Sequence, residues 1–149
     1  LVQLHESYKK FLNFDLSCIY LLIAGTYTPI ILVYLNNNFG ISILSIIWVL
    51  AIIGIAIVLG DYKPFNKFDL YLYLFMGWFA LIGIKELTNT MDMNGIILIF
   101  LGGLFFSIGV FFYFWESFRY SHAIWHLFYI SGCICHYFTI VGYTIPYKI

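Results

Sequence analysis

Charged residues are scarce in this sequence, at only 9% of its 149 residues. A soluble domain carries about a quarter charged residues, so this chain lacks the polar surface that water requires. Seven Lys and Arg residues balance seven Asp and Glu residues, and the formal net charge is zero. Without a basic surface, the chain has no electrostatic means of holding nucleic acid, and we expect no nucleic-acid partner.

Cysteine is rare as well. The three cysteines, Cys18, Cys133 and Cys135, all stand in apolar stretches. Their odd number and their spacing match neither a disulfide framework nor a zinc finger. We interpret them as small apolar side chains in the interior.

Hydrophobic residues make up 63% of the chain and gather in long runs. The length of each run is close to that of a helix crossing a bilayer, about 20 residues, and short polar breaks separate the runs. The runs lack the alternation of a β-strand, and a barrel strand needs only about 10 residues. The sequence therefore predicts an all-α, polytopic transmembrane helix bundle, a multi-pass integral membrane protein with membrane lipids as partners. One domain, residues 1–149, holds five spans of about 15–35, 41–60, 68–84, 95–115 and 122–143.

The basic residues between these spans predict an orientation. One side of the membrane carries five of them: Lys9, Lys10, Lys63, Lys67 and Arg119. The other side carries Lys85 and Lys148. By the positive-inside rule the first side faces the cytoplasm.

Two histidines at the start of the fifth span are candidate metal ligands. His122 and His126 are four positions apart, which places both imidazoles on one face of a helix and suits two ligands of one zinc ion. The alternative is that they cap the helix or pair with carboxylates. Because the fifth span begins on the same side as the first, Asp15 is expected near this pair, where a carboxylate can orient a ligand or move a proton. For Asp15 the alternative is a helix N-cap.

The other two histidines have different expectations. His136 lies ten residues beyond His126, about 15 Å along a helix, so it cannot share an ion with the pair. We expect it to form a hydrogen bond between helices. His5 precedes the first span on the cytoplasmic side, where it either completes a three-histidine site or lies on the surface.

Several motifs resemble the haemolysin III proteins, within the wider progestin and adipoQ receptor superfamily. The most specific is CIYLLIAGTYTP at residues 18–29. The others are LYLFMGW at residues 72–78, Gly102 and Gly103 followed by Gly109 and Tyr113, and SHAIWHLF at residues 121–128. The resemblance covers nearly the whole chain.

The resemblance implies a bundle of seven helices, of which these five would be the last, with an intramembrane zinc site near the cytoplasmic face. His122 and His126 match the family's zinc ligands, and Asp15 matches the family's aspartate beside the metal. The family's third ligand is a histidine in a Ser-x-x-x-His motif. His5 is the candidate for it here, with Leu1 at the serine position.

Three functions follow as expectations. The first is a zinc-dependent hydrolase of lipid amides or esters, with Asp15 assisting proton transfer. The second is a receptor or sensor whose zinc is structural and whose ligand is a lipid. The third, suggested by the family name, is a cytolysin, although spans that are apolar all round disfavour a toxin that starts soluble.

Overall fold

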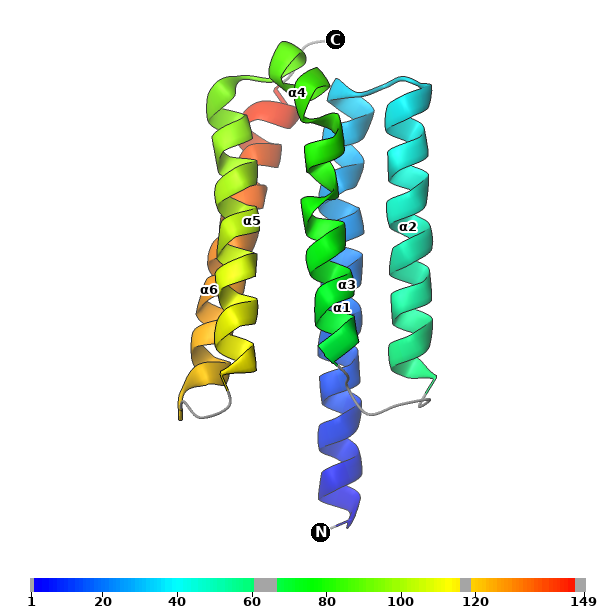
Figure 1. Ribbon diagram of the computed structural model, residues 1–149, viewed down its shortest axis with the longest axis vertical. Helices are drawn as coiled ribbons and strands as arrows, with labels where there is room; N and C mark the ends of the chain where they lie inside the picture. The colour runs from blue at the N-terminus through cyan, green and yellow to red at the C-terminus, as the bar shows by residue number, and fades with distance from the viewer. Residues whose placement is uncertain (1, 61–66, 116–118, 147–149) are drawn as a thin grey trace.

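The computed structural model describes residues 2–60, 67–115 and 119–146, and every regular element within these ranges is a helix (Figure 1). Five helical segments are long and apolar enough to cross a membrane, which confirms the predicted all-α transmembrane bundle. The spans are α1 (Val2–Tyr34), α2 (Asn38–Leu59), the series α3 (Lys67–Trp78), η1 (Phe79–Gly83) and α4 (Ile84–Thr90), then α5 (Met93–Phe114), and finally α6 (Ser121–Thr139) with η2 (Ile140–Thr144).

The helix bounds differ from the expected spans in two places. Helix α1 begins at Val2, well before Asp15, because its polar first part is helical although only Asn13–Tyr34 is apolar enough to cross a membrane. The third span continues to Thr90, where the sequence suggested a polar break from Lys85 onward. Only Met91 and Asp92 then separate α4 from α5.

Side-chain caps fix where two of the spans begin. The Asn37 side chain accepts a hydrogen bond from the Gly40 backbone N–H at 2.8 Å, at the start of α2. The Asp92 carboxylate accepts one from the Asn94 N–H at 2.8 Å, at the start of α5. Each cap satisfies a backbone donor that the first helical turn leaves unpaired.

Glycines let neighbouring helices approach closely, as transmembrane helices require. A Cβ added at Gly54 of α2 would lie 2.6 Å from the Tyr20 ring of α1. Between α5 and α6, a Cβ at Gly132 would lie 2.7 Å from Phe106, and one at Gly109 would lie 3.3 Å from Trp125. The outward faces of the spans instead carry exposed aliphatic and aromatic side chains, which suit a lipid solvent.

The third span changes from α-helix to 3-10 helix at Phe79. The Tyr27 hydroxyl of α1 lies at this junction, 2.6 Å from the Gly77 carbonyl and 3.2 Å from the Met76 carbonyl. In lipid a backbone carbonyl without a partner is costly, so this hydroxyl stabilises the end of α3. On the other side of α3, the Trp78 indole N–H donates to the Ser107 hydroxyl of α5 at 3.0 Å.

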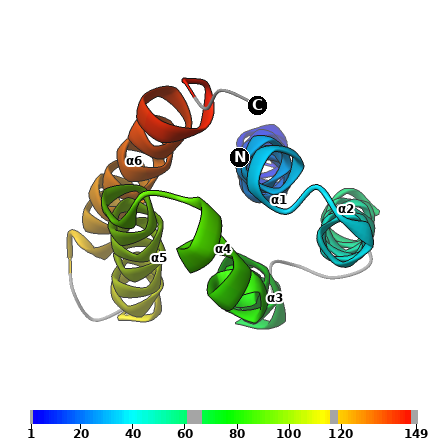
Figure 2. The same cartoon turned by 90° about the horizontal axis from the view of Figure 1, so that it is seen from above.

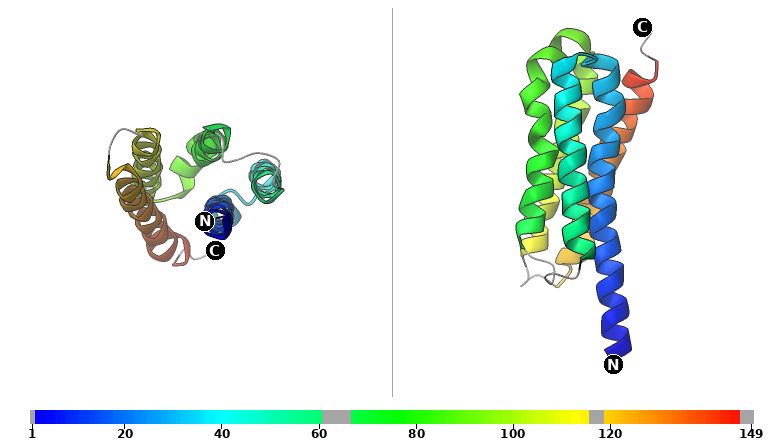
Figure 3. Two further views of the ribbon diagram at one scale, coloured as in Figure 1. Left: turned by 90° about the horizontal axis from the view of Figure 1, so that it is seen from below. Right: turned by 90° about the vertical axis from the view of Figure 1, so that its right-hand side faces the viewer.

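The spans form two tightly packed pairs, α1 with α2 and α5 with α6, and α3 contacts both pairs (Figure 2). The C-terminal end of α6 lies beside the end of α1, where the Tyr34 hydroxyl donates to the Tyr143 carbonyl. Figures 1 and 2 show α6 inclined, so that its first turns lie against α5 and farther from α1. We call this end of the bundle, where His122 and His126 lie, the histidine end. The N-terminal part of α1 extends beyond the other helices at the same end (Figure 3).

Candidate metal centre

The histidine pair lies in the first two turns of α6. The Nε2 atoms of His122 and His126 are 3.2 Å apart, and their ring centroids are 4.7 Å apart. His122 is exposed and His126 is half-buried. The four-residue spacing places the rings on one face of the helix, and the side-chain torsions turn the same nitrogen of each ring toward the other.

This geometry fits two ligands of one zinc ion. Zinc binds histidine nitrogen at about 2.0–2.1 Å in tetrahedral coordination, which places two ligand nitrogens about 3.3 Å apart. The observed Nε2 separation of 3.2 Å is close to that value. Two neutral imidazoles at this distance can also share a single hydrogen bond, with one ring as donor.

Trp125 holds the histidine face of α6 in place. Its side chain is 2% exposed, and its ring meets Tyr113 of α5 edge to face, with centroids 5.0 Å apart. Its side chain also lies near the buried Tyr73 hydroxyl of α3. Because Trp125 is anchored toward α3 and α5, the histidines on either side of it in the sequence stay at the edge of the bundle.

Asp15 lies in α1 at the same end of the bundle. It stands thirteen residues after the start of α1 at Val2, so it is not the N-cap of this helix. Its side chain is half-buried, and a Coulombic interaction links its carboxylate to the His122 imidazole. The structure thus brings a carboxylate within electrostatic range of His122.

Sequence reasoning missed Tyr129, which lies three residues after His126 on the same face of α6. Its hydroxyl lies near Cys133 and interacts electrostatically with Asp15 and Cys18 of α1. The helical spacing from the histidines was the signal that could have found it.

His5 and His136 take no part in this group. The side chain of His5 lies outside the described residues. Its backbone is ten residues before Asp15 in α1, a rise of about 15 Å, so the two residues are not level in the helix.

His136 lies farther along α6, and its Nε2 is buried with no hydrogen-bond partner in the described part of the chain. The imidazole instead interacts with the Ile99 backbone of α5, so the expected contact between helices does not involve Nε2. No group of three or more His, Cys, Asp or Glu side chains among the described residues is placed to hold a metal ion.

The fold and the position of this pair define a class, the polytopic helical membrane proteins with histidines at one end of the bundle. A family model described as "Haemolysin-III related" matches residues 1–137. The chain belongs to this family, as its motifs predicted.

Curated relatives agree with this assignment. The chain is 41% identical to Hemolysin-3 of Bacillus cereus over 93% of its own length and 63% of that protein. It is 39% identical to the Hemolysin-3 homolog of Bacillus subtilis, over 95% of its length and 67% of that protein. A more distant relative, at 28% identity, is the human monocyte to macrophage differentiation factor, of which 53% is covered. The chain thus spans roughly half to two thirds of these relatives, and no solved structure matches it.

Proposed function

We propose that this protein holds a zinc ion at the histidine end, near the cytoplasmic face, and uses it to hydrolyse an amide or ester bond of a lipid. The observation that supports the proposal best is the 3.2 Å separation of the His122 and His126 Nε2 atoms, with the Asp15 carboxylate within electrostatic range of His122. Zinc sites have three or four protein ligands. The proposal therefore requires at least one more ligand from outside the described side chains, and His5 stays a candidate by resemblance alone.

Each residue has a distinct role in this proposal. His122 and His126 would bind the ion through Nε2, so that each ring keeps Nδ1–H free to donate a hydrogen bond. Bound zinc supplies a Lewis acid and lowers the pKa of its water toward neutrality. Asp15, on a different helix, would hold that water by hydrogen bonding and take up its proton at the carboxylate. The Tyr129 hydroxyl would help to orient Asp15, with which it interacts.

An apolar pocket beside the site supports a lipid as the substrate. It has a volume of about 350 Å³ and is lined by α1, α3, α5 and α6. Tyr129 and Tyr73 are among its lining residues, so the pocket reaches the level of the histidine end. A hydrocarbon chain suits such a lining, because it buries apolar surface and asks for no hydrogen bonds.

Metal analysis of three purified full-length variants tests the metal site. His122→Ala and His126→Ala should each abolish stoichiometric zinc, because either change leaves too few ligands for tight binding. Asp15→Ala should keep most of its zinc. Full zinc occupancy in both histidine variants would remove the metal site from the proposal.

Turnover of fluorescent lipid amides and esters, measured on the same samples, tests the chemistry. The wild type should hydrolyse at least one of them, and Asp15→Ala should lose this activity while retaining metal. Undiminished turnover in Asp15→Ala would assign zinc a structural role, as expected for a receptor or sensor.

The name of the Bacillus cereus relative, Hemolysin-3, favours a second candidate function, the disruption of membranes. Release of a trapped dye from liposomes by the purified protein tests it. Cytolysis predicts dye release that persists in the zinc-free His122→Ala variant, whereas a resident zinc hydrolase predicts none.

A further inference from the structure

Four aromatic side chains that carry polar atoms meet inside the bundle towards the histidine end. They come from α1, α3, α5 and α6, and we call them the tyrosine cluster: Tyr20, Tyr73, Tyr113 and Trp125. The Tyr73 hydroxyl lies at its centre, with the Trp125 side chain near it and the Tyr20 and Tyr113 hydroxyls within electrostatic range. The Trp125 and Tyr113 rings meet edge to face, with centroids 5.0 Å apart. Polar atoms of four spans thus gather at one place in the interior.

The tyrosine cluster is shielded from solvent. Tyr20 is 1% exposed, Trp125 2% and Tyr73 5%. A phenol hydroxyl both donates and accepts hydrogen bonds and an indole N–H donates, so these groups can satisfy one another without water. A polar group that loses its partner in lipid is costly, so the cluster resists being pulled apart. It therefore restrains the relative positions of the helices that contribute to it.

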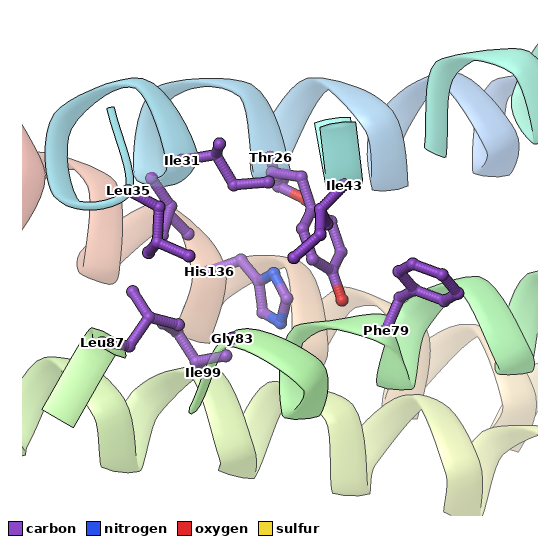
Figure 4. A pocket seen from close by; sticks show the side chains of 11 residues that line it. Thr26, Ile31, Leu35, Ile43, Phe79, Gly83, Leu87, Ile99 and His136 are labelled. Atoms are coloured by element: carbon purple, nitrogen blue, oxygen red, sulfur yellow. The ribbon is translucent and has the colours of Figure 1, made fainter. Parts of the chain in front are cut away.

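The cluster joins two parts of the bundle that are separated by pockets. The closest packing is within two pairs, α1 with α2 and α5 with α6, and α3 contacts both pairs (Figure 2). One pocket, of about 350 Å³, lies at the level of Tyr73 and Tyr129. Another, of about 450 Å³, is lined by side chains of both pairs, among them Ile31 of α1 and His136 of α6 (Figure 4). Because side chains do not fill this space, specific contacts must hold the two pairs in register.

The proposed metal centre is divided between the same two pairs. Asp15 belongs to α1, whereas His122 and His126 belong to α6. Tyr20 follows Asp15 by five residues in α1, a rise of about 7.5 Å. Trp125 directly precedes His126, and their ring centroids are 4.4 Å apart. The cluster therefore connects the helix that carries the carboxylate to the helix that carries the imidazoles.

We propose that the Tyr73 hydroxyl is a positioning group, which holds the α5–α6 pair at the distance from α1 at which Asp15 can serve a zinc-bound water. The catalytic part of this proposal rests on the proposed hydrolysis, and the structural part rests on the tyrosine cluster alone. Tyr73 suits the role because α3 contacts both pairs. Removing its hydroxyl leaves the spacing of His122 and His126 intact, since the geometry of one helix fixes it. Zinc should therefore stay bound while the carboxylate moves relative to the ion.

The distance between α1 and α6 in the full-length protein tests the structural part. In a cysteine-free background, nitroxide labels at Phe14→Cys and Leu127→Cys report it by pulsed electron paramagnetic resonance in nanodiscs, and both of these side chains are exposed. Tyr73→Phe should shift or broaden the distance distribution. The matched control is Tyr27→Phe, which removes another buried hydroxyl between α1 and α3, about 10 Å along α1 from Tyr20. It should leave the distribution unchanged. This measurement requires neither zinc nor turnover.

Turnover of a fluorescent lipid amide or ester by the same variants, without labels, tests the catalytic part. In Tyr73→Phe the kcat should fall about 10- to 100-fold, because a displacement of about 1 Å can cost about 100-fold. The zinc content should equal that of the wild type, and KM should change little, since the hydrocarbon contacts remain. Tyr27→Phe should keep the wild-type kcat, whereas a general loss of stability would lower kcat in both variants.

The two measurements separate this proposal from the proposed hydrolysis. A distance distribution that Tyr73→Phe leaves unchanged would overturn the positioning role whatever the activity. Equal changes in Tyr73→Phe and Tyr27→Phe would also overturn it, because they would indicate a general loosening of the bundle. So would a wild-type kcat in Tyr73→Phe. A wild type without zinc or turnover would refute the proposed hydrolysis, and the distances would still decide whether Tyr73 holds the two pairs in register.

Discussion

Replacing Gly54 with alanine probes the packing of α2 on α1. The new methyl carbon would lie 2.6 Å from Cε1 and Cζ of the Tyr20 ring, about 1 Å closer than carbon atoms normally approach. Tyr20 is 1% exposed, so its ring has no free space to enter. The two helices must therefore separate or the ring must leave its preferred torsion.

The magnitude follows from comparison with Gly25→Ala in α1. A Cβ at Gly25 meets no described atom within 4 Å, so this variant gains the helix preference of alanine without a clash. Both variants share that gain, and their difference isolates the cost of overpacking, about 1–3 kcal/mol. Gly54→Ala should be the less stable of the two by that amount.

Reversible unfolding in mixed micelles, followed by far-UV circular dichroism during titration with dodecyl sulfate, measures both free energies of unfolding. The double variant Tyr20→Leu with Gly54→Ala completes a mutant cycle, because the smaller side chain leaves room for the methyl group. The cycle should show a coupling of at least about 1 kcal/mol. Variants Gly54→Ala and Gly25→Ala of equal stability would refute the close contact between Tyr20 and Gly54.

Three further predictions use the same preparations. Tyr27→Phe removes the hydroxyl that serves the Met76 and Gly77 carbonyls, and it should lower the free energy of unfolding by about 1–2 kcal/mol; unchanged stability would contradict that role. Asp92→Ala removes the cap of α5 and should lower the free energy of unfolding by about 1 kcal/mol, whereas Asp92→Asn should lower it by less. Equal losses of stability in the two variants would count against capping. His136→Ala should leave the zinc content of the full-length protein unchanged by metal analysis, since its imidazole is too far along α6 to reach the pair; zinc loss would contradict this separation of His136 from the pair.

The positions of the five spans could be predicted from the sequence because lipid exposure leaves a strong hydropathy signal. The first part of α1 could not, since residues such as His5 and Lys9 are polar and hydropathy reports lipid crossing rather than helicity. The change to 3-10 helix at Phe79 lies beside the hydrogen bonds that the Tyr27 hydroxyl donates, and Tyr27 is some fifty residues away in the sequence. No local pattern encodes such a contact.

The candidate site shows the same division. Helix geometry alone brings His122 and His126 together, so their spacing was sufficient to predict the pair. The position of Asp15 relative to them depends on the tilt of α6, which packing on α5 determines. The sequence does not record that tilt, and it also gave no sign that the Nε2 atom of His136 would be left unpaired.

A small rotation of the last span about a pivot at the hydrogen bond between Tyr34 and Tyr143 would be magnified at the other end of that span. His122 stands 21 residues before Tyr143, about 30 Å along the axis of the span, so a rotation of about 5° at the pivot displaces the imidazole by about 3 Å. That displacement equals the reach of one hydrogen bond. The close packing of α6 on α5 must therefore suppress even small rotations about this contact, because they would change the separation between carboxylate and imidazole at the other face of the bilayer.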